Sequence, residues 1–116
     1  VSPERMPDLY RAADIFLHLS KDESFGNVYV EAMACGLPVV AYDLPRTRWI
    51  VGEAGMLSPS ESPDELSRTI SAALAAGPDR SEQSVARASG FRWAEIARQY
   101  RRFFEEVVGK REGLPV

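Results

Sequence analysis

Two glutamates, Glu23 and Glu31, lie eight residues apart on either side of Gly26, and this pair is the feature of the sequence that could best support chemistry. If a helix begins just after Gly26, the free N–H groups of Gly26, Asn27 and Val28 point outward with the positive end of the helix dipole. Such a helix start favours a phosphate or diphosphate, and glycine lets the backbone approach the anion closely.

The two carboxylates would lie at opposite ends of that anion site. Glu31 is one turn into the expected helix, about 6 Å beyond the anion at a rise of about 1.5 Å per residue. Its two oxygens suit the paired hydroxyls of a ribose, and Glu23 would reach the other end of the same ligand. Two hydroxyl-rich groups that flank a diphosphate describe a nucleotide sugar. Taken alone, a pair of glutamates at this spacing is more often a pair of solvated charges.

The order of the expected elements indicates an α/β fold. Strands are predicted at 15–19, 38–42 and 56–57, and helices at 8–13, 27–35, 46–51, 63–76, 81–89 and 93–108. Asn27 is a candidate N-cap and Gly36 a natural stop for the second helix, while Ser62 and Glu65 have the spacing of a capping box. Strands that alternate with helices predict a parallel sheet, with ligand-binding loops at the carboxyl ends of its strands.

The composition limits the functions that the chain can have. Its 116 residues are 45% hydrophobic and carry a formal net charge of −3, which fits one globular domain without the positive charge that nucleic-acid binding requires. The single cysteine, Cys35, excludes an internal disulfide and offers no paired spacing for zinc. No apolar run reaches the roughly 20 residues of a membrane span, so we expect a soluble, cytoplasmic protein. Because the first residue is Val1 rather than methionine, we expect further chain upstream.

The motif around the glutamates resembles that of a known family. Residues 23–40 read ESFGNVYVEAMACGLPVV, which looks like the E-x7-E signature of the retaining glycosyltransferases of family 4, the glycosyltransferase group 1 enzymes with the two-domain GT-B architecture. Segments 9–16 and 55–59 also resemble this family, so the similarity covers roughly residues 7 to 108. It implies a partial domain, the C-terminal half of a Rossmann-like donor domain. Its parts would be a nucleotide-sugar-binding portion at 7–90, an amphipathic helix at 91–109 and a tail at 110–116.

The resemblance also implies a role for each motif residue. Glu23 would be the catalytic residue, because it would hydrogen-bond the donor sugar as that sugar gains oxocarbenium-like character. Glu31 would bind the ribose. The residues that would hold the sugar and the diphosphate are Ser24, Phe25, Gly26, Asn27 and Val28.

The implied reaction transfers a hexosyl group from a UDP-, GDP- or ADP-sugar to a glycan, a lipid or a small molecule. It retains the anomeric configuration and uses neither cofactor nor metal. In the family the basic residues that pair with the diphosphate, and the acceptor domain, lie upstream, so an upstream domain is implied. We therefore expect the chain alone to bind donor weakly, to transfer nothing and to self-associate through its open sheet edge. The alternative is a stand-alone, non-catalytic module that binds nucleotide sugars or a partner protein.

Several other residues have structural interpretations. His18 is predicted to be packed or hydrogen-bonded within a strand, and Cys35 to be a small buried residue. The aromatic row of the last helix is predicted to be core; its members are Trp93, Tyr100, Phe103 and Phe104. The arginines beside this row are expected to form a solvated face, with contact to the inner face of a membrane as the alternative. Residues 44–49 depart from the Gly-Gly and glutamate of the family, which leaves the donor identity open.

Overall fold

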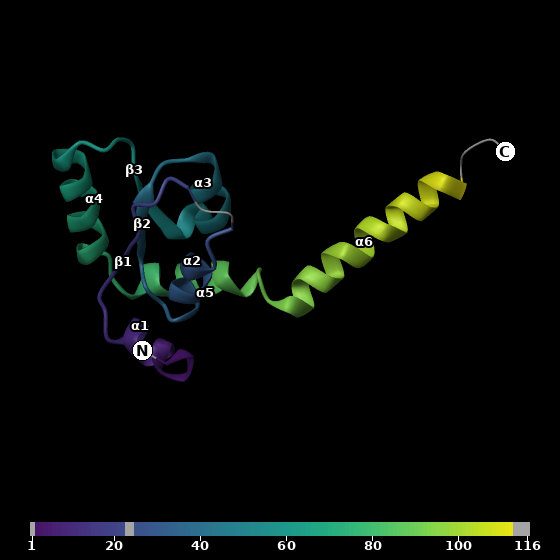
Figure 1. Cartoon of the computed structure of the whole chain (residues 1–116), viewed down its shortest axis with the longest axis horizontal. Helices are drawn as coiled ribbons and strands as arrows, with labels where there is room; N and C mark the ends of the chain where they lie inside the picture. The colour runs from purple at the N-terminus through teal and green to yellow at the C-terminus, as the bar shows by residue number, and fades with distance from the viewer. Residues whose placement is uncertain (1, 23–24, 113–116) are drawn as a thin grey trace.

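The computed structural model describes residues 2–22 and 25–112, the last two by their backbone alone, and it has a three-stranded parallel sheet at its centre (Figure 1). The strands are β1 (Phe16–Leu17), β2 (Val39–Tyr42) and β3 (Gly55–Ser58), in the order β1-β2-β3. Val39 of β2 lies opposite Phe16 on one side and Gly55 on the other. Residues 39–41 are fully buried, as expected for the central strand of a parallel sheet. The predicted α/β fold, a Rossmann-like parallel sheet flanked by helices, is confirmed.

The helices follow the predicted order, with boundaries shifted by a few residues. They are η1 (Pro3–Arg5), α1 (Met6–Arg11), α2 (Asn27–Ala34), α3 (Pro45–Val51), η2 (Gly52–Ala54), α4 (Pro63–Ala75), α5 (Pro78–Ser89) and α6 (Trp93–Glu112). Prolines begin α3, α4 and α5, because the first turn of a helix does not need their missing N–H. The predicted capping box of α4 does not form, since Glu65 accepts a hydrogen bond from Ser60 rather than closing on Ser62.

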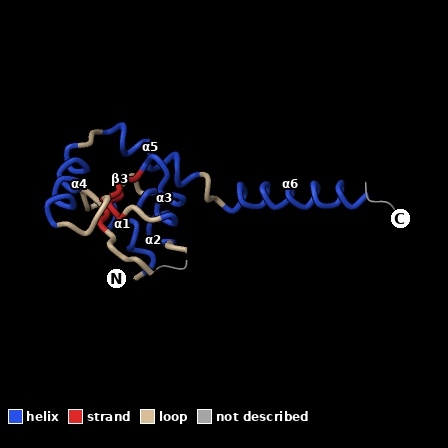
Figure 2. Tube along the Cα trace, turned by 90° about the horizontal axis from the view of Figure 1, so that it is seen from above, coloured by secondary structure: helices blue, strands red, loops and turns tan. Residues whose placement is uncertain are grey.

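Helices cover both faces of the sheet. α4 packs against β2 and β3 on one face, whereas α2 and α3 lie on the other face, with α5 packed against α2 (Figures 1 and 2). The largest hydrophobic cluster fills the space between the sheet and this second layer. Its buried members are Tyr29, Met33, Val39, Ala41, Ile50, Val51, Ala54 and Ala88. The loop that carries the predicted site runs from β1 to α2, so the second layer determines its position.

The start of α2 differs from the prediction in one respect. Asn27 is the first residue of the helix rather than its N-cap, and Gly26 occupies the N-cap position with φ 86° and ψ 52°. This left-handed backbone is open to glycine and unfavourable for residues with a Cβ. Gly36, with φ 82°, follows the end of the helix as predicted. Two left-handed glycines therefore bracket the helix that carries Glu31.

The last helix, α6, projects away from the sheet and its covering helices (Figures 1 and 2). It gives the molecule dimensions of 61 × 34 × 27 Å and a radius of gyration of 17.7 Å, against about 13 Å for a compact chain of this length. The aromatic row of α6 is exposed, with 87% of Trp93 and 60% of Tyr100 accessible to solvent. The prediction that this row is core is therefore wrong for the described residues.

The apolar residues of α6 recur at alternating intervals of three and four, which is the spacing of a seam against a second helix. Self-association of the chain stays a prediction. On the polar side of α6, Glu95 pairs with Arg98 at 2.6 Å and with Arg102 at 3.8 Å. These pairs are exposed, so each contributes at most about 1 kcal/mol. Within residues 2–22 and 25–112, no helix has both the length and the apolarity to cross a membrane.

Candidate functional site

The predicted site lies where the loop after β1 meets the first turn of α2. Glu23 and Ser24, two of the predicted site residues, lie outside the described residues. Asn27 is exposed and Val28 half-buried at the front of α2. The N–H groups of a first helical turn have no carbonyl partner within their own helix. Of the residues predicted to hold the anion, Asn27 is thus at the surface and Val28 partly so, whereas Gly26 is buried.

Gly26 is held in place by the ring of Tyr29, one turn further along the chain. A Cβ on Gly26 would lie 2.6 Å and 2.8 Å from two ring carbons of Tyr29. The ring cannot easily give way because Tyr29 is fully buried, with Phe16 and His18 edge-on to it at centroid distances of 6.0 and 5.1 Å. His18 is packed among aromatic rings, as predicted. The site glycine is therefore required both for its backbone conformation and for the space beside it.

Glu31 accepts a hydrogen bond from a residue that is not among the predicted site residues. The hydroxyl of Tyr10 in α1 donates a hydrogen bond of 2.9 Å to Oε2 of Glu31. The two residues line a cavity of about 340 Å³, together with Met6, Pro7 and Cys35 among others. Cys35 is half-buried there rather than buried. The predicted ribose-binding carboxylate thus faces a cavity between α1 and α2.

The environment of Tyr10 changes its acidity. Burial, the hydrogen bond to Glu31 and the negative charge of that carboxylate, in this order, raise the pKa of Tyr10 from its ordinary value of 10.0 to about 12. The phenol therefore keeps its proton and remains a hydrogen-bond donor throughout the neutral and mildly alkaline range.

This raised pKa predicts a loss of stability in alkali. Because the pKa is higher in the folded chain, the contribution of Tyr10 is complete below pH 10 and is lost as the pH rises towards 12. A difference of two pKa units corresponds to about 2–3 kcal/mol. We expect the free energy of unfolding, measured in urea at pH 9 to 12, to fall more steeply for the native chain than for Tyr10→Phe. Parallel curves for the two chains would contradict this coupling.

Phe25, just ahead of the glycine, belongs to an aromatic cluster. The ring centroids of Phe25, Trp49 and Phe91 are 5.8 to 6.0 Å apart, and the rings meet edge-on. Trp49 is in α3 and Phe91 follows α5, so the cluster fastens the loop to both helices. Arg87 of α5 lies over Phe91 at 5.1 Å and donates to the backbone carbonyls of Trp49 and, at 2.9 Å, Ile50. Trp49, which lies in the stretch 44–49 that departs from the family pattern, is therefore one of the residues that hold the site loop.

Replacing Trp49 with alanine should destabilise the chain by about 1–3 kcal/mol. Trp49 loses its contacts with Phe25 and Phe91, and each edge-to-face aromatic pair contributes about 0.5–1.5 kcal/mol. Unfolding in urea measures the difference. The matched control is Trp93→Ala, because 87% of Trp93 is exposed and a change of less than about 0.5 kcal/mol is expected. Equal losses for the two variants would show that the cluster does not hold the loop.

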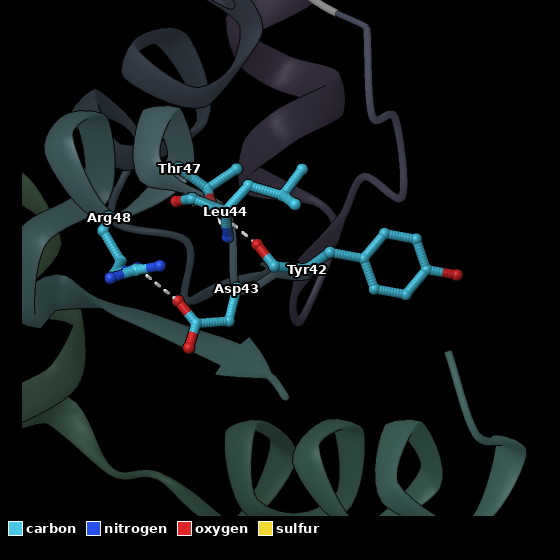
Figure 3. A network of polar contacts seen from close by, with 5 residues as sticks. All are labelled: Tyr42, Asp43, Leu44, Thr47 and Arg48. Carbon is cyan, nitrogen blue, oxygen red and sulfur yellow. Dashed lines mark hydrogen bonds and ion pairs between the residues drawn. The ribbon is translucent and has the colours of Figure 1, made fainter. Parts of the chain in front are cut away.

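The turn after β2 is fixed by hydrogen bonds to a single threonine (Figure 3). The hydroxyl oxygen of Thr47 accepts from the N–H of Leu44 at 3.0 Å and lies 2.5 Å from the carbonyl oxygen of Tyr42. Beside it, Nε of Arg48 is 2.7 Å from Oδ1 of Asp43. A Thr three residues after the N-cap that bonds back to its N–H is half of a capping box. Residues 44–49, which depart from the family pattern, thus form an ordered helix start.

A smaller hollow of about 170 Å³ lies at the carboxyl ends of β2 and β3. Its lining includes Tyr42 and Asp43 at the end of β2, and also Lys21 and Glu61, which form an ion pair. Lys21 comes from the same loop as the predicted donor site. The hollow thus lies where open α/β sheets bind ligands, at the carboxyl ends of parallel strands.

Comparison with known proteins identifies the family. Residues 1–76, more than half of the chain, match the family model described as Glycosyl transferases group 1. The chain therefore belongs to the group 1 glycosyltransferases, and the resemblance seen in the motif at 23–40 is confirmed at the level of the family.

Curated relatives support the same assignment. The chain is 41% identical over 96 residues to a D-inositol 3-phosphate glycosyltransferase of Mycolicibacterium gilvum, a match that covers 80% of the chain and 22% of the relative. It is 35% identical over 101 residues to the enzyme of that name from Rhodococcus erythropolis, covering 83% and 23%. An O-antigen chain mannosyltransferase B of Escherichia coli is 36% identical over 95 residues, covering 82% and 24%. The chain thus spans about a quarter of the length of these relatives.

Proposed function

We propose that this chain carries the part of a retaining glycosyltransferase that binds the nucleotide-sugar donor. The observation that best supports this function is the position of Glu31. Its carboxylate accepts from Tyr10 beside a cavity of about 340 Å³, one turn along a helix that begins after the left-handed Gly26. One helix therefore offers N–H groups to a diphosphate and a carboxylate to ribose hydroxyls. Membership of the group 1 family supports glycosyl transfer as the reaction.

In the proposed reaction a hexosyl group moves from a UDP-, GDP- or ADP-sugar to a hydroxyl of a glycan, a lipid or a small molecule, with retention at the anomeric carbon. Glu23 hydrogen-bonds the sugar as the bond to the diphosphate breaks, and Glu31 holds the ribose. The diphosphate leaves with the bonding electrons and takes up the proton of the acceptor hydroxyl, and N–H groups between Ser24 and Val28 stabilise its charge. No resident cofactor or metal takes part in this scheme.

The length of the relatives bears on what the 116 residues do alone. Because the matched region is about a quarter of each relative, we propose that residues 7–90 supply donor contacts and that acceptor contacts come from elsewhere in the enzyme. On this basis the isolated chain binds donor weakly and transfers nothing. Measurable transfer by the isolated chain would contradict the proposal that the acceptor contacts come from elsewhere in the enzyme.

The test is an assay of the natural gene product against a panel of UDP-, GDP- and ADP-sugars. Release of the nucleoside diphosphate should depend on one donor and one class of acceptor. Nuclear magnetic resonance of the product should show the anomeric configuration of the donor. An inverted product would exclude the retaining reaction, and donor binding without transfer would favour the alternative considered next.

A non-catalytic module is the second candidate function. The observation that favours it is the exposed aromatic row of α6, which includes Tyr100, Phe103 and Phe104 and offers a surface to a partner protein. Glu31 and its cavity would then serve binding alone. Turnover by the natural gene product excludes this candidate, whereas specific donor binding without turnover supports it.

A further inference from the structure

We propose that Tyr10 is the positioning residue for Glu31, and that its hydroxyl holds the carboxylate in the orientation that receives the ribose hydroxyls of the donor. This role rests on the proposed function of Glu31. It adds to the site a residue from a different helix, 21 positions earlier in the chain.

The ring of Tyr10 is well fixed, which a positioning residue requires. Only 8% of Tyr10 is exposed, and its ring packs in a small core cluster with Ala32 and Leu37. Phe16 of β1 meets the ring edge-on, with the centroids 6.0 Å apart and the planes at 64°. The hydroxyl therefore projects from a packed ring that α1, α2 and β1 hold together.

Glu31, in contrast, is an exposed residue of α2 with a side chain that would otherwise be free to rotate. Fixing an exposed, rotamer-rich side chain opposes binding if it occurs only when the ligand arrives. The hydrogen bond from Tyr10 fixes one carboxylate oxygen in advance, so the second oxygen has a defined place at the cavity.

The chemistry of the donor group also suits this role. A carboxylate has about four lone-pair sites, and a neutral phenol occupies one of them without cancelling the negative charge. A lysine or arginine would neutralise the carboxylate and compete with the ribose hydroxyls for its oxygens. Among the residues that the structure describes, Glu31 forms no salt bridge. The carboxylate is therefore oriented while it keeps its charge for the ligand.

A purely structural interpretation is that the bond only fastens α1 to α2. The apolar contacts of Met6, Tyr10, Ala32 and Leu37 already join these helices, and removing the hydroxyl leaves them intact. The two interpretations differ in what they predict for donor binding when the hydroxyl alone is lost.

The experiment compares donor KM and kcat for the natural gene product and its Tyr10→Phe variant. We expect the donor KM to rise about 3- to 10-fold, as for the loss of one hydrogen bond, with kcat changed less than about twofold. Tyr100→Phe is the matched control, because Tyr100 is 60% exposed on α6; its donor KM should not change. An unchanged donor KM in Tyr10→Phe would overturn the inference.

A double-mutant cycle separates positioning from structure. In a Glu31→Ala background, Tyr10→Phe should have no further effect on donor KM, because the hydroxyl acts through the carboxylate. An equal rise in both backgrounds would show a structural role and overturn the inference. A rise for Glu31→Ala with none for Tyr10→Phe would leave the proposed function standing, while the absence of any nucleotide-sugar binding by the native protein would remove both.

A second variant covers the case in which Tyr10→Phe does not fold. Glu31→Asp keeps the charge but shortens the side chain by one methylene, which draws the carboxylate away from the Tyr10 hydroxyl. We expect the donor KM to rise by a factor similar to that of Tyr10→Phe. A donor KM equal to that of the native protein would overturn the inference.

Discussion

Replacing Gly26 with alanine should lower the free energy of unfolding by about 2–5 kcal/mol. The backbone at Gly26 is left-handed, with φ 86°, and a residue with a Cβ is less stable there by roughly 1–2 kcal/mol. The new methyl group would also lie 2.6 Å from a ring carbon of Tyr29. Because Tyr29 is fully buried, it can move only by disturbing the core, and overpacking of this kind costs about 1–3 kcal/mol.

Urea unfolding of the chain measures this effect, and Gly109→Ala is the matched control. A Cβ on Gly109 has no atom within 4 Å, and Gly109 is in the interior of α6, so alanine should stabilise that helix by up to about 1 kcal/mol. The two glycine substitutions should therefore act in opposite directions. If Gly26→Ala unfolds at the same urea concentration as the native chain, the glycine is not required for the geometry of the site loop.

Replacing Glu31 with alanine should weaken nucleotide-sugar binding by the natural gene product about 10- to 100-fold. Hydrogen bonds to a charged group contribute about 1.5–3 kcal/mol, and each 1.4 kcal/mol is a factor of ten in affinity. Stability should change far less, because Glu31 is exposed and alanine is a good helix former. The expected result is thus a loss of affinity in a folded protein.

Titration calorimetry with ribose and 2′-deoxyribose forms of the same nucleotide locates the effect. The native protein should prefer the ribose form, whereas Glu31→Ala should bind both forms equally weakly. Glu82→Ala is the control, since Glu82 is an exposed residue of α5, and it should keep the native preference. If the preference for ribose survives in Glu31→Ala, the carboxylate does not contact the sugar hydroxyls.

The fold could be predicted to a large extent because its signals are local. Pro63 begins a helix and Gly36 follows the end of one, as predicted, and each acts through the conformation of its own backbone. Pro45 and Pro78 also begin helices, whereas the expected helices begin at 46 and 81. The buried strand at 39–42 is a continuous apolar run, as parallel sheets require. The capping residue of α2 was predicted wrongly because a glycine with left-handed backbone competes with asparagine for that position.

The site could be predicted only in part, for a physical reason. The positions of Gly26 and Glu31 on one helix follow from helical spacing, whereas the bond from Tyr10 depends on how α1 packs against α2. No pattern near Tyr10 signals a partner 21 residues away. The periodicity of α6 likewise indicates that one face is apolar, but a period carries no information about which surface covers that face.

The hydrogen bonds from Arg87 hold the end of α3 through its backbone and not through its side chains. Arg87 donates to the carbonyl oxygens of Trp49 and Ile50, and a carbonyl is present whichever amino acid occupies the position. The end of α3 is therefore fixed through groups that substitution does not change. Mutations at position 46, whose side chain is exposed, can accumulate without displacing the helix. This edge of the sheet can change its surface chemistry between related proteins while its backbone keeps one shape.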